Sequence, residues 1–579
     1  MTRARLGALA VVAVAFLGIA SNAHAQEGPG REAFVFLVPG VSFEEMLGTP
    51  DIVSLSRAGG AGLMTLGGGL PTEGEMEEEP GERVTFHFRW LDPATEGGLE
   101  GVTSTIRSSV EASSADRALV VVASTVPSPE MRAAKDELHP VVVAEGAAAD
   151  LFPESGAQGS LTSDSTRRAG VVTDLDVIPT IAAFRGVDAP ADAVGSPIEV
   201  IDRPPPLELH ERYLAQRRMY VPIGTAGAIY LAVAGLGGIA VLALAGRVPE
   251  RLRRIFGWAC LSVAMLATSL VAAGHIPDLT YATIVPFVAL VTVFGTLAFA
   301  PLEHRDVLLV PTGIGITVLL YFALEAALSW TAALTPFVGG SELDGGRFYG
   351  LPNAFIGLLI GACLWVAHRL RTSVGFAILV AAAVFAGMPY LGSNLGGGVS
   401  LFAAAGLWLA VRDRDRLGPW KGLGVFVAVT LAGAALFVLA HAVSPLETHV
   451  TRFEEHAGGL GAVFERLGDR LQVGFDLIAR NPFVLVPVLG LPVTIAAVLW
   501  PPGPLRPSLR SSPAWRDAIL VTLLAGVVAY LVNDSGPAAA GFAFGLGLGG
   551  LLGMSLLSGA GKMEAVSTSD DPEMAGLRP

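Results

Sequence analysis

Polar and charged side chains gather at a few points of an otherwise apolar chain, and several are of types that bind anions. Arg167 and Arg168 end the stretch STRR, and guanidinium groups beside hydroxyls can bind phosphate or carboxylate without catalysing a reaction. Glu325 lies within an apolar run, where a carboxylate is costly unless it is paired or hydrated, so it marks a candidate site. The remaining candidates stand beside other apolar runs: Arg347, Tyr349, Asn353, Asn394, His449, Asn533 and Asp534.

Each cluster also has a purely structural interpretation. Asn and Asp side chains cap helices, and neighbouring glycines allow helices to pack closely. The two arginines of STRR can equally be solvated on a surface turn. The choice between binding and structure depends on which elements carry these residues.

The apolar runs are long enough to form membrane helices. Of the 579 residues, 52% are hydrophobic and 16% are charged, which is too apolar for a soluble protein of this size. A membrane helix needs roughly 20 apolar residues. We predict eleven spans, at 220–246, 255–274, 281–301, 307–331, 353–368, 373–391, 395–411, 422–441, 482–500, 516–532 and 537–558. Together they make an all-α polytopic membrane domain over residues 220–558.

The N-terminus predicts the orientation of these spans. Residues 1–25 have a basic start, an apolar stretch and an A-x-A site, the pattern of a secretory signal peptide. An uncleaved first helix is the alternative, and it would leave residues 26–210 on the same, outer side. The loops that then face the cytoplasm all carry Arg or Lys, whereas the short external loops are nearly free of them. We therefore predict a multi-pass membrane protein, with the tail 559–579 cytoplasmic and the polar clusters lining one outward-facing pocket.

The long external loop, 442–481, carries apolar residues three and four apart with charged residues between them. This spacing predicts an amphipathic helix, which either lies on the outer membrane surface or packs on the exported domain.

The exported segment 26–210 has the pattern of an α/β domain. Apolar runs at 33–40, 118–125 and 140–146 are bounded by turn residues, as buried strands are, and 51–64 and 175–186 are predicted helices. Only two cysteines occur, both inside apolar runs, so this domain cannot form a disulfide. The net charge of −14 argues against nucleic acid as a partner, and the acidic run 73–82 is most simply a solvated loop.

The exported domain contains, in order, a strand ending at Gly40, then TPDIVSLSRAGGAGLMT, then DRALVVVAST, then residues 159–187. This order of segments resembles a reduced form of the alkaline phosphatase superfamily. The resemblance implies a fold and a two-metal site of Asp and His ligands. Pro39 stands where that family carries its first metal-binding Asp, and an Asp-His-Gly cluster is missing after 118–125. Asp174 and Asp176 remain, but we interpret them as turn or cap residues. We therefore predict no metal, no cofactor and no phosphatase activity.

The layout of signal, exported domain and spans with RFYG, SNLGGG and NDSG is similar to that of uncharacterised envelope membrane proteins of bacteria. This resemblance implies the architecture and a location in a bacterial plasma membrane, but no activity. Our hypothesis is a protein that binds or handles a phosphorylated or lipid-linked envelope component at the outer face of the lipid bilayer. An envelope phospho- or glycosyl-transferase or hydrolase, and an ion-coupled transporter using Glu325 and Asp534, are the alternatives. The sequence names no protein partner.

Overall fold

The computed structural model describes residues 30–66, 86–190, 193, 195–244, 246–338, 343, 349–443, 485–533 and 536–558. The protein is mostly helical, with a mixed sheet in its N-terminal part. Its contacts divide it into two compact units. The sheet unit comprises Met1–Ser128, His139–Thr162 and Asp174–Pro205, and the helical unit comprises Pro129–Leu138, Ser163–Thr173 and Pro206–Pro579.

The sheet unit is built on strands rich in valine, alanine and phenylalanine. Its strands follow the order β3-β1-β4-β5-β2-β6-β8. β1 is parallel to both β3 and β4, β2 is parallel to β6, and the pairs β4–β5, β2–β5 and β6–β8 are antiparallel. The strands are β1 (Arg31–Leu37), β2 (Gly59–Thr65), β3 (Phe86–Trp90), β4 (Arg117–Ala123), β5 (His139–Gly146), β6 (Gly159–Thr162) and β8 (Glu199–Ile201).

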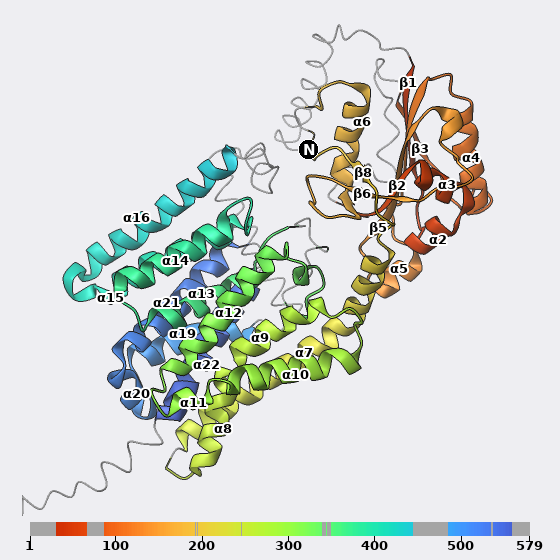
Figure 1. Ribbon diagram of the computed structural model, residues 1–579. Helices are drawn as coiled ribbons and strands as arrows, with labels where there is room; N and C mark the ends of the chain where they lie inside the picture. Colours follow the sequence, from red (N-terminus) through yellow and green to blue (C-terminus); the bar gives the residue numbers. More distant parts are fainter. Residues whose placement is uncertain are drawn as a thin grey trace, which may run out of the picture. The chain divides into compact units, whose positions relative to one another are not determined.

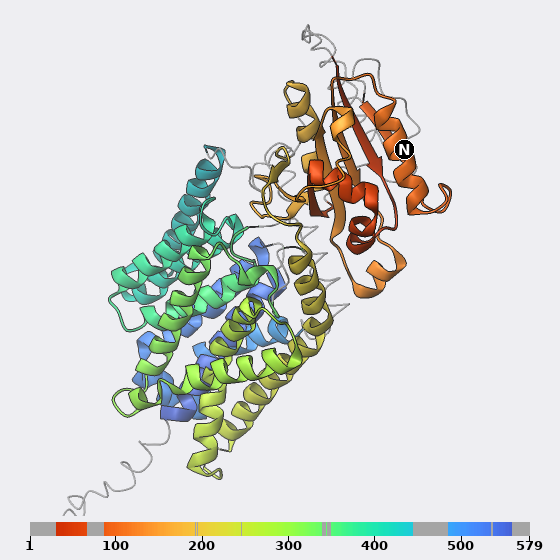
Figure 2. The ribbon, with the colours of Figure 1, turned by 45° about the vertical axis from the view of Figure 1, so that its right-hand side comes forward.

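Helices cover both faces of this sheet. α2 (Phe43–Gly48), α3 (Pro50–Ala58) and α4 (Leu99–Glu111) pack on one face, and α6 (Val177–Arg185) packs on the other (Figures 1 and 2). Alternate residues of the strands serve the two faces, so Phe34 and Phe36 join the core beneath α2, α3 and α4. The predicted α/β architecture of this region is therefore present.

One predicted element is wrong in part. Residues 51–64 were expected to form a single helix, but the helix α3 ends at Ala58 and the chain continues as the strand β2. The glycines at 59, 60 and 62 disfavour a helix and allow close strand contact. A Cβ on Gly59 would lie 2.0 Å from the carbonyl oxygen of Val143, a residue of the neighbouring strand β5.

The helical unit is a bundle that contains a helix in each of the eleven predicted spans. Its helices are α5 (Pro129–Ala134), α7 (Leu207–Ala243), α8 (Glu250–Leu261), α9 (Val263–Ala272), α10 (Tyr281–Leu297), α11 (Ala300–Glu303), α12 (Leu309–Ala327), α13 (Phe355–Ala367), α14 (Thr372–Gly387), α15 (Leu395–Arg412), α16 (Arg414–Ala442), α19 (Leu485–Leu499), α20 (Arg506–Ser511), α21 (Pro513–Val532) and α22 (Gly536–Ser558). The short strand β7 (Val171–Thr173) and the 3-10 turns η3 (Ala273–His275) and η4 (Ala332–Leu334) also belong to it.

In the described part of the chain, seven helices are long and apolar enough to cross a membrane, which suggests a multi-pass membrane protein. The pair α8–α9 makes an eighth candidate, bent by 43°. Three further apolar helices are shorter: Phe355–Ala367, Thr372–Gly387 and Leu489–Leu499. The number of eleven crossings thus remains a prediction.

The short helix α13 lies at the centre of the bundle. Every one of its residues is buried, and it packs against α12, α14, α21 and α22 (Figure 1). A helix that is apolar on all sides is typical of such a position. Its contact with α22 is close, since a Cβ on Gly357 would lie 2.0 Å from the carbonyl oxygen of Ala539. By contrast, most of α16 faces outward.

Several sequence predictions lie outside the described residues. These are the signal peptide 1–25, the acidic run 73–82, most of the loop 442–481 and the tail 559–579.

Candidate functional site

Three predicted site asparagines lie where helices of the bundle begin or end, and we call this the Asn-rich end. Asn353 precedes α13, Asn394 is the N-cap of α15, and Asn533 follows α21. The same end includes the turns after α12 and α14, because neighbouring helices run in opposite directions. The packing of the helices thus brings together polar residues that are distant in the sequence.

Asn394 makes hydrogen bonds with every part of its amide. Its Oδ1 accepts from the Gly397 backbone N–H at 2.7 Å, which caps α15. Its Nδ2 donates to the Leu351 carbonyl at 2.7 Å and to Asn353 Oδ1 at 2.9 Å. The side chain is fully buried. Asn394 therefore joins the start of α15 to the segment that leads into α13.

Asn533 is also buried and also joins two helices. Its Nδ2 donates to the carbonyl of Ala529, one turn earlier in α21, at 2.9 Å and to Ser400 Oγ of α15 at 3.1 Å. Its Oδ1 has no hydrogen-bond partner in the described part of the chain. Capping and helix contact account for its two donors and leave the acceptor unused.

Glu325, near the end of α12, is a buried and paired carboxylate. Its Oε1 is hydrogen-bonded to His275 Nε2 of η3, and its Oε2 accepts from the Ala332 backbone N–H of η4 at 3.2 Å. Only 1% of the residue is exposed. The expectation that this carboxylate needs a partner is met by His275, a residue that the sequence analysis did not select.

The turn after α12 has an unusual backbone. Ser329 and Trp330 have φ values of 54° and 60°, in the left-handed region that larger side chains rarely adopt. The turn is held by the Trp330 N–H, which donates to the Glu325 carbonyl at 2.7 Å, and by Trp330 Nε1, which donates to the Leu391 carbonyl at 2.8 Å. Trp330 is buried and connects the ends of α12 and α14.

The segment Ser163–Thr173, which contains the STRR motif, packs within the helical unit at this same end. Arg168 is buried, and its guanidinium donates to the carbonyls of Ser329 and Trp330, the latter at 3.4 Å. The cation thus occupies the carbonyl-rich turn after α12, where a positive charge is favourable. This contact supports a structural role for Arg168.

Arg167 is placed differently. Its guanidinium is half-buried, donates one hydrogen bond to the Pro389 carbonyl at 3.0 Å and lies over the Tyr349 ring at 4.8 Å. Tyr349 in turn donates from its hydroxyl to the Tyr390 carbonyl at 3.1 Å. Burial lowers the pKa of the Arg167 guanidinium from its ordinary value, and the nearby charge of Asp164 acts in the opposite direction.

No ion pair joins Arg167 to a carboxylate within the part of the chain that the structure describes. Its backbone is also strained, with φ of 52°. A cation that is partly desolvated, stacked on an aromatic ring and not ion-paired to a described carboxylate is arranged to accept an anion.

The structure thus gathers Arg167, Arg168, Tyr349 and Glu325 around the turns after α12 and α14, with Asn353 and Asn394 linked to them through the segment before α13. The predicted site residues Arg347, His449 and Asp534 lie outside the described residues. Trp330, His275 and Tyr390 were missed; only the position of His275 directly after an apolar run offered a signal.

In the sheet unit, two of the positions compared with phosphatase metal ligands, Pro39 and Asp176, lie in turns or bind backbone N–H groups. Pro39 lies in the turn after β1, where Gly40 has φ of 71° and donates to the Val126 carbonyl at 2.9 Å. Asp176, buried at the start of α6, accepts from the Ser196 N–H at 3.0 Å. Among the described residues, no three His, Cys, Asp or Glu side chains gather as a metal site.

No protein-family model, curated protein or solved structure matches this chain. The function is therefore argued from the geometry of the Asn-rich end.

Proposed function

We propose that this chain is a multi-pass membrane protein that binds a phosphorylated or lipid-linked envelope component at the Asn-rich end, with Arg167 as the group that contacts the anion. The observation that carries this proposal is the half-buried Arg167 guanidinium, which lies over the Tyr349 ring and forms no ion pair in the described part of the chain, although Asp164 is near enough to act on its pKa.

The hydrogen-bonding capacity of Arg167 supports this role. A guanidinium has five N–H donors, and the described contacts of Arg167 use one of them, toward Pro389. Placing a cation partly out of water is unfavourable unless an anion or several acceptors compensate. A phosphate fits, because its oxygens accept two parallel hydrogen bonds from one guanidinium.

The neighbouring residues hold Arg167 in place. Tyr349 supplies a ring beneath the guanidinium, and Arg168 fixes the segment by its bonds to the turn after α12. Asn353, Asn394, Asn533 and Glu325 then form the structural support of the site. Arg347, His449 and Asp534 belong to the proposal as further contacts of the ligand.

The proposal also covers the membrane topology of the chain and the role of its sheet unit. We include eleven crossings, an exported sheet unit and an Asn-rich end on the outer side, in agreement with the distribution of Arg and Lys in the sequence. We also include a reduced, non-catalytic alkaline phosphatase-like role for the sheet unit. The α/β layering and Pro39 after β1 support this role.

The test uses the full chain in lipid nanodiscs with a polyprenyl phosphate as the probe. We expect Arg167→Ala to weaken binding of the probe about tenfold, because a charge-assisted hydrogen bond is lost, and Arg167→Lys to recover part of it. The matched control is Arg218→Ala, since Arg218 is exposed and, among the described residues, its side chain bonds to the carbonyl of Leu214 within its own helix α7. Equal affinities of the wild type, Arg167→Ala and Arg218→Ala would disprove the proposal.

A further inference from the structure

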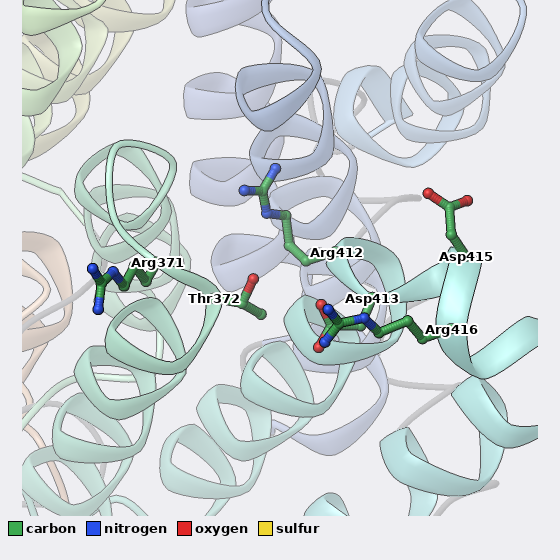
Figure 3. A pocket seen from close by; sticks show the side chains of 6 residues that line it. All are labelled: Arg371, Thr372, Arg412, Asp413, Asp415 and Arg416. Atoms are coloured by element: carbon green, nitrogen blue, oxygen red, sulfur yellow. The ribbon is translucent and has the colours of Figure 1, made fainter.

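The opposite ends of the same helices carry a concentration of arginines, which we call the Arg-rich end. Here α14 begins, α15 ends and α16 begins. A pocket of about 550 Å³ opens between them. Figure 3 shows Arg371 and Thr372 on one side of it, Arg412 in the middle, and Asp413, Asp415 and Arg416 on the other side.

Two of the arginines that line the pocket form no ion pair with a described carboxylate. Arg371 and Arg416 are exposed, and neither is ion-paired within the described part of the chain. Arg371 is also the N-cap of α14, and no described side chain caps the first turn of that helix. The first N–H groups of α14 and the helix dipole therefore add positive potential beside these two cations.

The third arginine is held rigidly. The Arg412 guanidinium lies over the Trp408 ring at 5.3 Å, and Trp408 Nε1 donates to the Thr372 carbonyl at 3.1 Å. Its nearest carboxylate is that of Asp517, at 3.7 Å. Asp517 is already bonded to Arg414 at 2.8 Å and lies 3.3 Å from Arg516, so one carboxylate serves three cations. The pocket lining itself carries three arginines and two aspartates, so with Asp517 shared in this way a small excess of positive charge remains at the pocket.

The pocket also borders an exposed apolar surface. Gly418, with φ of 66° and ψ of 174°, breaks α16, so that Arg414–Leu417 forms a separate turn beside the pocket. Directly after this break, Trp420 is 82% exposed and Leu423 is 51% exposed. Exposed tryptophan next to an apolar helix is typical of the level of lipid headgroups. An anionic headgroup at this level can reach the arginines.

We propose that this pocket binds the phosphate group of an anionic ligand, with Arg371 and Arg416 as its contacts and Arg412 as the fixed cation between them. Basic pockets between membrane helices recognise anionic headgroups in this way. The pocket is distinct from the Asn-rich end, and the proposal does not depend on the function proposed there.

The test measures which lipids remain bound to the full chain after purification from nanodiscs of phosphatidylcholine and phosphatidylglycerol. We expect wild type to retain phosphatidylglycerol selectively, and Arg371→Ala/Arg416→Ala to bind it about tenfold more weakly. The control Arg506→Ala/Arg510→Ala removes the same charge from exposed residues of α20, which do not line the pocket. Equal retention by the two double variants would overturn the proposal.

Soluble glycerol phosphate distinguishes the two sources of the phosphate group. Displacement of phosphatidylglycerol from wild type by glycerol phosphate would show that the phosphate alone is recognised, as for a free phosphorylated compound. Retention of the lipid under the same conditions, together with its loss in Arg371→Ala/Arg416→Ala, would identify a lipid headgroup as the ligand. Binding of neither probe above the level of the pocket variant would contradict the proposed site.

Discussion

At the scale of single residues, the polar side chains of the Asn-rich end differ in how many of their hydrogen-bonding atoms are used within the protein. Arg168, Asn394 and Glu325 use their hydrogen-bonding atoms on the protein itself. Arg167 has unused donors and no ion pair within the described residues. Residue type alone therefore does not tell which side chains are bonded to the protein and which keep free donors, because an arginine occurs in each group.

Asn394 provides a test of this distinction. We expect Asn394→Ala to lower the free energy of unfolding by about 2 kcal/mol, because buried hydrogen-bonding groups of Gly397 and Leu351 lose their partner. Asn394→Asp keeps an N-cap acceptor but places a carboxylate against the Leu351 carbonyl and Asn353 Oδ1, so it should destabilise at least as much. Thermal unfolding of the full chain in detergent measures both. A stable Asn394→Asp variant would mean that capping alone explains this residue.

At the scale of elements, glycines decide how closely segments approach. The strand β2 lies between β5 and β6, and Gly59 meets the Val143 carbonyl without room for a side chain. In the helical unit the same effect brings α13 and α22 together at Gly357. These contacts depend on which partner lies opposite each glycine.

We predict that Gly59→Ala destabilises the sheet unit by about 3 kcal/mol, because its Cβ would force β2 away from β5. Gly48→Ala is the matched control, since a Cβ on Gly48, at the end of α2, meets no atom within 4 Å. Hydrogen exchange of the β2 and β5 amides in the full chain gives the readout. Unchanged protection in Gly59→Ala would contradict the close packing described for β2.

At the scale of the whole molecule, the chain does not divide at a single point. Two segments, Pro129–Leu138 and Ser163–Thr173, lie in sequence among the strands but pack within the helical unit. The first is attached through His210 of α7, whose Nε2 lies 2.7 Å from Asp136 Oδ2, with both side chains 4% exposed. Arg217, also on α7, pairs with Glu137 at 2.6 Å.

This attachment predicts that His210→Ala loosens the segment Pro129–Leu138. The variant leaves the Asp136 carboxylate buried without its imidazole partner, a change that costs about 3 kcal/mol in comparable buried pairs. We expect faster hydrogen exchange and proteolysis at this segment in the full chain. The double variant Asp136→Asn/His210→Gln replaces the carboxylate and the imidazole by two amides that can bond to each other, and it should recover part of the protection. Identical protection in wild type and His210→Ala would show that the pair does not hold the segment.

The sequence by itself determined the large-scale features of the protein. Composition and run length indicated an apolar, helix-rich second half, and short valine-rich runs indicated strands before it, because burial depends on residue type and period. It also predicted that Glu325 needs a partner, since an isolated carboxylate is unfavourable in an apolar run.

Only the tertiary structure decided which residues meet. The ending of α3 at Ala58, the partner His275 of Glu325, the different contacts of Arg167 and Arg168, and the pocket beside Arg371 all depend on contacts between segments far apart in the chain. A local pattern holds no information about such contacts, because the energy of a polar group is set by the atoms that the fold places opposite it.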